Sequence, residues 1–385
     1  MPNINTVRFS SLGWESLEIG NRPPVQPFAE MNNNIQQEGE IMSTVGSLSG
    51  HEPDITSLVT HPMIVGTGKV GIEVELENVQ HARMTYWNAI SDHSLRNSGV
   101  EFVMKQPLGG RDLQQAIFEL DTTLYSMEPD ASWRCSTHIH LDVRDMTVPQ
   151  LKKFILTYTA LERIIFQCSG LQRWDNVFCP SFGFAQGQIS KLSRLWNRND
   201  RDFLRGLDTS ESYRDRDKYS SLNFLPIRRQ GSVEFRGSEA KFRKGQLLRL
   251  ANRTLSIREF ALSFEGSEVD LVNHISNTHP SKVLKKSMPS KFAYDEGDIM
   301  KGCDLAMDII HLHEISGTRI DTEVTVRTRW AEAWRERFNS NKPRTISAIT
   351  LINMCRDENC WVGDFCHTSD FSKLQQFAAD NSITL

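Results

Sequence analysis

The sequence has no continuous apolar stretch of the length that a membrane-spanning helix requires, about 20 residues. Its N-terminal segment lacks a basic start followed by an apolar run, so we expect no secretory signal. It also lacks a large charge excess, because 44 Lys and Arg oppose 48 Asp and Glu, for a formal net charge of -4. These absences argue against a membrane protein, a secreted protein and a nucleic-acid-binding protein.

The seven cysteines are an odd number and are scattered, which argues against a disulfide framework. Free thiols are typical of a reducing compartment, and we expect a cytoplasmic protein of bacterial or phage type, the latter acting in the host cytoplasm. Cys355, Cys360, Cys366 and His367 lie close together, but only a C-x₄-C half resembles a zinc motif. We therefore interpret them as ordinary buried cysteines.

The chain of 385 residues is long enough for one large domain or two ordinary ones. Residues 1–60 show no periodicity and are rich in Pro, Asn, Ser and Gly, which predicts an irregular N-terminal arm; a partner contact through this arm stays open. Residues 61–270 contain the strand and helix patterns of a catalytic domain. Residues 271–385 are expected to be mostly helical, for example over 296–313 and 330–338.

Four segments alternate apolar and polar residues with the period of two that marks a strand with two unlike faces. They are residues 69–77, 99–105, 133–143 and 232–236. Apolar stripes with helical spacing predict helices between the strands and after the last of them. These are residues 111–127, a helix that begins at Thr147 in a capping box with Gln150, and residues 245–263. The pattern predicts an α+β fold, a mainly antiparallel sheet with helices packed on one face.

The polar faces of the four predicted strands carry the residues suited to chemistry. If the strands are neighbours, one sheet face would collect four carboxylates, two imidazoles and a guanidinium. These groups belong to Glu73, Glu75, Glu101, His138, His140, Glu234 and Arg236. Four carboxylates together would raise one another's pKa unless cations lay among them, and such ligands suit Mg²⁺ or Mn²⁺. For each strand alone, the alternative is a solvated acidic face or an exposed histidine.

Residues 191–250 are basic within an acidic chain, with 15 Lys and Arg against 8 Asp and Glu. Part of this excess fits a solvated basic helix surface at residues 194–201. The basic residues beside the strand patterns are better candidates to bind a phosphate group. They are Lys218, Arg228, Arg229 and Arg236.

These motifs, in this order, resemble the putative amidoligase family, which is related to glutamine synthetase and γ-glutamylcysteine synthetase. The matching pieces are Gly71-Ile-Glu-Val-Glu-Leu-Glu77, Asp92-His-Ser-Leu95 with Gly99-Val-Glu101, Ser136-Thr-His-Ile-His-Leu-Asp142, Lys218-Tyr219 with Asn223, and Val233-Glu-Phe-Arg-Gly237. The resemblance covers residues 69–240. It implies a glutamine-synthetase-like fold with a curved sheet, and an ATP- and Mg²⁺-dependent ligase that joins a carboxylate to an amine through an acyl phosphate.

The resemblance also implies two metal ions, Mg²⁺ or Mn²⁺, by motif position. One ion would be held by Glu73, His138 and Glu234, and the other by Glu75 and Glu101.

Further roles implied by the resemblance concern the ligands. His140 would approach the ATP phosphates, and Arg236 would stabilise the transferring phosphoryl group. Asp92 would bind or deprotonate the amine, while Lys218 and Asn223 would line the substrate or nucleotide pocket. Whether the acid and the amine are small molecules, peptides or protein side chains stays open.

Three other functions could use the same residues. A metal-dependent hydrolase would need the ion but not ATP, and a kinase of the same broad fold would release a phosphorylated product. A structural or assembly protein would retain the fold without activity. The number of charges kept on one predicted sheet face favours the ligase.

Overall fold

The computed structural model describes residues 43–53, 58–95, 97, 99–132, 134–170, 173, 179, 181–182, 186–207, 220–288 and 294–315. Several sequence predictions lie outside these residues. They are the arm over residues 1–42, Lys218, the helix at 330–338 and the cysteine cluster at 355–367.

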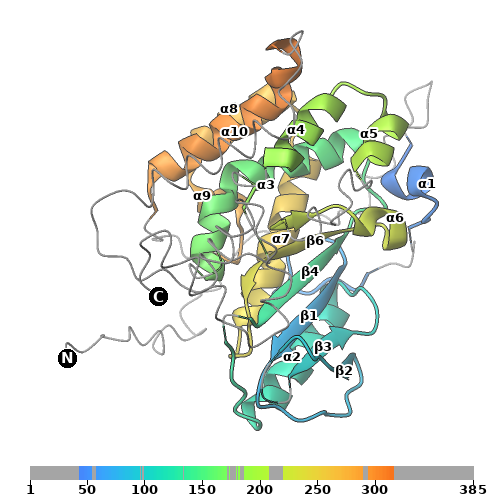
Figure 1. Ribbon diagram of the computed structural model, residues 1–385, viewed down its shortest axis with the longest axis vertical. Helices are drawn as coiled ribbons and strands as arrows, with labels where there is room; N and C mark the ends of the chain where they lie inside the picture. The colour runs from blue at the N-terminus through green and yellow to red at the C-terminus, as the bar shows by residue number, and fades with distance from the viewer. Residues whose placement is uncertain are drawn as a thin grey trace, which may run out of the picture. The chain divides into compact units, whose positions relative to one another are not determined.

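Within the described residues, six strands form one open sheet in the order β2-β3-β1-β4-β6-β5 (Figure 1). The strands are β1 (Val70–Leu76), β2 (Trp87–Ser91), β3 (Val100–Met104), β4 (Ser136–Asp142), β5 (Leu222–Asn223) and β6 (Ser232–Glu239). Each pair of neighbouring strands is antiparallel, which confirms the predicted type of sheet.

One face of this sheet is apolar and forms part of the core. On β1 and β4, Val70, Ile72, Val74, Ile139 and Leu141 are each at most 1% exposed, because alternate residues of a strand point to the same face. The residues between them on β1 are only partly buried and point the other way. The period of two seen in the sequence therefore separates a packed face from a polar face.

Ten helices lie in the described residues, and the longer of them pack on the apolar face or on one another. The ten are α1 (Val45–Ser49), α2 (Gly110–Tyr125), α3 (Val148–Ser169), α4 (Gln186–Leu195), α5 (Asp200–Leu207), α6 (Pro226–Gln230), α7 (Gln246–Ser263), α8 (Glu268–Ser276), α9 (Pro280–Val283) and α10 (Glu296–Ile315). The long helices α3 and α7 contact each other and the strands β6 and β4, respectively. A further layer, α8 and α10, packs on α3 (Figure 1).

The predicted start of α3 is confirmed in detail. Thr147 Oγ1 accepts a hydrogen bond from the Gln150 amide, and Gln150 Oε1 accepts one from the Thr147 amide at 2.8 Å. The predicted helices at 111–127, 245–263 and 296–313 correspond to α2, α7 and α10.

A short segment before the predicted catalytic domain also packs on it. Val45 is fully buried, and its amide donates to Met146 O at 2.8 Å. The Gly46 amide donates to Arg144 O at 2.9 Å. Residues 43–51 therefore adjoin the turn between β4 and α3.

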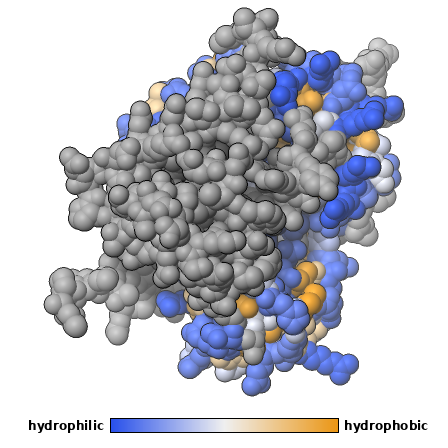
Figure 2. All heavy atoms as spheres, viewed as in Figure 1, coloured by the Kyte–Doolittle hydropathy of each residue, from blue (hydrophilic) through white to orange (hydrophobic). Residues whose placement is uncertain are grey.

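Hydrophilic residues dominate the coloured part of the face in Figure 2; several hydrophobic residues (orange) lie low in the view, where Figure 1 shows β2, β3 and α2, and a few others lie near its top. In β2 and α2, the exposed large hydrophobic residues are Ile90, Phe118 and Tyr125. No helix in the described part of the chain is long and apolar enough to cross a membrane.

The α3 capping box generates a test of the fold. Replacing Thr147 by Ala removes the acceptor for the Gln150 amide, and we expect the free energy of unfolding to fall by about 0.5–2 kcal/mol. Chemical denaturation measures it. The control is Thr122→Ala, because the Thr122 hydroxyl donates only within its own helix, to Phe118 O at 2.8 Å. Equal losses in the two variants would contradict the role of the capping box.

Candidate functional site

Strand register brings the predicted polar residues together on the face opposite the core. Glu73 lies opposite His138 across β1 and β4, and Glu75 lies opposite Glu101 across β1 and β3. His140 lies opposite Glu234 across β4 and β6. Directly opposed residues of an antiparallel pair point to the same face, so these side chains share one surface. The β4–β6 register shifts between Thr137 and Ile139, so that Arg236 and Gly237 of β6 lie opposite the single residue His138 of β4. Such bulges re-aim side chains beside functional sites.

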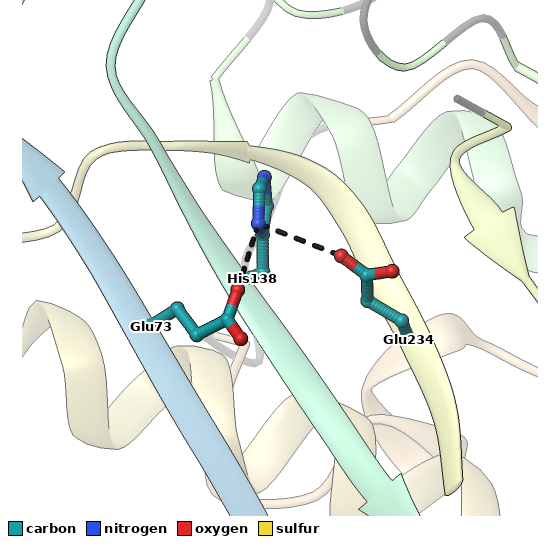
Figure 3. A group of neighbouring side chains, drawn as sticks. All are labelled: Glu73, His138 and Glu234. Atoms are coloured by element: carbon teal, nitrogen blue, oxygen red, sulfur yellow. Dashed lines mark hydrogen bonds and ion pairs between the residues drawn. The ribbon is translucent and has the colours of Figure 1, made fainter. Parts of the chain in front are cut away.

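Three of these side chains converge from three neighbouring strands (Figure 3). Glu73, His138 and Glu234 each offer a ligand atom, and the three atoms lie within 4.8 Å of one another. His138 Nδ1 is 3.2 Å from Glu73 Oε2 and 3.5 Å from Glu234 Oε1. His138 and Glu234 are buried, while Glu73 is partly exposed and gives access from solvent. We refer to these residues as the triad.

The hydrogen bonds behind His138 fix which ring nitrogen faces the carboxylates. Ser136 Oγ lies 2.5 Å from Glu75 Oε2 and 2.7 Å from His138 Nε2. A carboxylate only accepts, so the Ser136 hydroxyl donates to Glu75, and its oxygen accepts the Nε2 proton of His138. A neutral His138 therefore presents the lone pair of Nδ1 to two carboxylates.

That arrangement of an imidazole lone pair and two carboxylates is repulsive unless a positive charge lies between them. A second proton on His138 would supply it, and so would a divalent cation. Two carboxylate oxygens and one imidazole nitrogen are suitable ligands for such an ion. A hydrogen-bonded Ser136 and Glu75 are the kind of outer partners that orient a metal-binding histidine. The donor set therefore fits the predicted metal position.

The electrostatics of the triad keep its carboxylates ionised. Burial alone would raise the pKa of Glu73, but hydrogen bonds with His138 and His140 lower it well below the usual range. For Glu234, burial is likewise outweighed by the charges of His138, Arg236 and His140, which lower its pKa. Burial would lower the pKa of His140, but the hydrogen bond to Glu73 and the charge of Glu234 raise it.

The second predicted pair, Glu75 and Glu101, lies beside the triad in an acidic group. Burial, together with the charges of Glu73, Glu75 and Asp92, raises the pKa of Glu101 to about 7. Asp92 therefore lies near Glu101, and its own carboxylate accepts from the Ser94 amide at 2.8 Å. A cation bound here would offset the repulsion between Glu101 and the neighbouring carboxylates.

Other predicted residues contact the triad directly. Arg236 Nη1 donates to Glu234 Oε1, and Asn223 Nδ2 donates to Glu234 Oε2 at 2.7 Å. His140 Nε2 is 3.4 Å from Glu73 Oε1. On its other side, His140 Nδ1 accepts from Gln230 Nε2 at 2.9 Å, so the remaining ring proton faces Glu73.

Two predicted phosphate candidates are not joined to this group. Arg228 and Arg229 lie on α6 with exposed side chains, and no contact among the described residues connects their guanidinium groups to the triad. The Arg228 carbonyl instead lies 2.6 Å from His51 Nε2. Sequence reasoning assigned no role to Ser136 or Gln230. Ser136 lies two residues before His138 in the alternation, so its phase was a signal for the same face.

Residues 91–252 match a family model described as putative amidoligase enzyme. The match contains Asp92, Glu101, the two strand histidines, Asn223, Glu234 and Arg236, while Glu73 and Glu75 precede it. The match supports the resemblance found in the sequence and suggests a ligase-type enzyme. Comparison with curated proteins gave no match.

The raised pKa of Glu101 predicts a pH-dependent stability. A carboxyl group with a raised folded pKa stabilises the fold only while it is protonated, so this contribution is lost as pH rises from the ordinary pKa of 4.5 through about 7. Without divalent cations, we expect Glu101→Gln to raise the melting temperature at pH 8 and to change it little at pH 5. Thermal denaturation with a chelator measures this. Glu265→Gln, at an exposed loop carboxylate, is the control. A Glu101→Gln effect that is the same at both pH values would contradict the assignment.

Proposed function

We propose that the protein is an ATP- and Mg²⁺-dependent carboxylate–amine ligase with a glutamine-synthetase-like arrangement of its sheet. The observation that carries the proposal is the triad of Glu73, His138 and Glu234 with Arg236 hydrogen-bonded to its edge. This group lies partly within a segment that matches the amidoligase family. A cation site beside an arginine is a suitable environment for a nucleoside triphosphate, because both neutralise phosphate oxygens.

The proposed reaction has two steps. An oxygen of the substrate carboxylate attacks the γ-phosphorus of ATP, the bond to the bridging oxygen breaks, and an acyl phosphate and ADP form. The amine nitrogen then attacks the acyl carbon, inorganic phosphate leaves with the C–O electron pair, and the amide remains. The proton released by the amine would be accepted by Asp92, which lies beside Glu101 at the end of β2.

The residues of this chain would divide the work as follows. Glu73, His138 and Glu234 would hold one divalent ion, and Glu75 with Glu101 a second; bound ions would neutralise charge on the phosphoryl oxygens. Arg236 would donate to the oxygens of the transferring phosphoryl group. His140, with its Nε2 proton facing Glu73, would donate to a neighbouring phosphate oxygen.

A release assay for ADP, run with Mg²⁺ and pooled carboxylates and amines, tests this proposal against its alternatives. A ligase releases ADP at a sustained rate only when both an acid and an amine are present. ADP release that needs only one acceptor would indicate a kinase. Hydrolysis of a pooled amide or ester with metal but without ATP would indicate a hydrolase, and either result would overturn the ligase assignment.

Substitutions of Glu234 and Arg236 are expected to impair different properties, ligand binding for Glu234 and turnover for Arg236. Glu234→Gln removes a charged metal ligand, so binding of both metal and Mg²⁺-ATP should weaken. Arg236→Lys keeps the charge but loses the forked donor geometry, so turnover should fall by roughly 10²–10³ with little change in ATP affinity. Isothermal titration and ADP-release kinetics separate the two effects. Parental binding and turnover in both variants would contradict the site assignment.

Gly71 offers a probe of where the ligand lies. It is the second residue of β1 and lies opposite His140, and a Cβ there would meet only the His140 Cβ, at 3.7 Å. Room therefore exists for a side chain that projects over the polar face. We expect Gly71→Leu to keep the melting temperature and to weaken Mg²⁺-ATP binding by roughly tenfold or more, about 1.4 kcal/mol.

Gly71→Ala is the matched control for the Leu variant, because its methyl group fits at an ordinary contact distance. It should retain the fold and lose less affinity than Gly71→Leu. Unchanged ATP affinity in a folded Gly71→Leu protein would show that the nucleotide does not cover this part of the face.

A further inference from the structure

The sheet ends beside β6, the strand of Glu234, in a very short edge strand, β5. β5 has only two residues, Leu222–Asn223, which pair with Phe235 and Glu234 of β6. Asn223 uses its side chain to hold Glu234 Oε2 at 2.7 Å, while Asn223 Oδ1 accepts from the Leu225 amide at 3.0 Å. So short a strand contributes few ladder hydrogen bonds, and its position must depend on contacts outside the ladder.

Those contacts come from a buried carboxylate on α3. Glu162 is 3% exposed, and its Oε1 accepts from Ser221 Oγ at 2.5 Å. The Phe182 amide donates to both carboxylate oxygens, at 2.8 Å and 2.9 Å. Tyr158 Oη donates to Oε1 at 3.3 Å. Glu162 therefore joins the helix beneath the sheet to the residue that directly precedes β5.

Ser221 is also hydrogen-bonded to the backbone of Arg236, which links Glu162 to β6. The Ser221 carbonyl accepts from the Arg236 amide at 2.8 Å. The Arg236 carbonyl in turn accepts from Nη2 of Arg173, a buried guanidinium, at 3.3 Å. Both backbone groups of Arg236 are thus held by residues outside the named strands, and one of these residues, Ser221, is the one that Glu162 holds.

The burial of Glu162 needs a reason, because a desolvated carboxylate costs several kcal/mol unless its hydrogen bonds compensate. Its neighbours on the same stripe of α3, Tyr158, Leu161 and Ile165, are buried aromatic or aliphatic residues. An apolar residue would fill such a position at no desolvation cost. A charged acceptor does something that an apolar residue cannot, since it binds donors from separate segments of the chain at once.

We propose that Glu162 is a positioning residue for the candidate site. Through Ser221 it fixes β5 and the backbone of β6, so that Asn223 orients Glu234 and the Arg236 side chain is held beside it. Glu162 itself lies on the core side of the sheet and touches no ligand. The inference rests on the proposed metal site for its functional consequence, but its structural part stands on the hydrogen bonds alone.

The test compares Glu162→Gln and Ser221→Ala with Ser193→Ala. Ser193 is the matched control, since it is fully buried and its hydroxyl donates within α4, to Ile189 O at 3.0 Å. Amide hydrogen exchange, measured without metal, tests the hydrogen-bonded connection from Glu162 through Ser221 to Arg236. In both test variants the Arg236 amide should exchange faster than in the parent protein, while amides of β1 and the centre of α3 keep their protection. The control should match the parent. Unchanged protection of the Arg236 amide in a folded Ser221→Ala protein would overturn the proposal.

Titration with Mn²⁺, followed by electron paramagnetic resonance, reads the consequence for the site. Loss of an outer partner of a metal ligand typically weakens metal binding by about 10–100-fold, and Asn223 is such a partner of Glu234. We expect Ser221→Ala, which acts through the position of Asn223, to fall in the same range. Asn223→Ala should cause a similar loss, and the double variant should lose little more, because both act on Glu234. If Glu162→Gln and Ser221→Ala both bind Mn²⁺ with the affinity of the parent protein, the positioning role is overturned. Absence of Mn²⁺ binding by the parent protein would instead contradict the proposed metal site, while hydrogen exchange still decides the Glu162 connection.

Discussion

The site depends on one electrostatic constraint, that two carboxylates converge on one ring nitrogen of His138, Nδ1. The Ser136 hydroxyl, committed to Glu75, fixes this orientation by accepting the other ring proton. Glu73 Oε2 and Glu234 Oε1 lie 3.2 Å and 3.5 Å from that nitrogen, so a positive charge must be present for the group to be stable. A proton can meet this need, but a divalent ion meets it with the ligand atoms already in place. The remaining features of the polar face, including Arg236 and the acidic group around Glu101, surround this point.

The fold holds these charged side chains together because the sheet has one apolar face, which is buried, and one polar face, which carries them. The apolar residues of β1 and β4 are buried under α3 and α7, so the hydrophobic effect fixes the strand register. A slip of one residue would turn Glu73 and His138 into the core, which would be very costly. The same packing presents the carboxylates to a surface that ligands can reach. Glu162, a charge on the core side, supports the weakest edge of the sheet where packing alone offers little.

The alternation of apolar and polar residues was sufficient to predict β1, β3, β4 and β6 and the face that their charged residues share. Phase within a strand is local, and register follows once the apolar sides pack together. What could not be predicted depends on contacts distant in the chain. β5 is too short to show a period, and β2 has an exposed Ile90 that breaks its alternation. The bulge of β6 opposite His138, and the hydrogen bonds of Ser136 to Glu75 and His138, depend on contacts between neighbouring strands. Arg228 and Arg229 are close to the strand motifs in sequence, but α6 carries them on its exposed surface.

The central claim, that a divalent cation binds between Glu73, His138 and Glu234, is tested most directly by anomalous diffraction from crystals grown with Mn²⁺. The account predicts an anomalous peak within bonding distance of Glu73 Oε2, His138 Nδ1 and Glu234 Oε1, with His138 Nε2 still hydrogen-bonded to Ser136. The peak should disappear in Glu234→Gln crystals grown in the same way. Ordered triad side chains in Mn²⁺-containing crystals with no anomalous peak between them would contradict the claim.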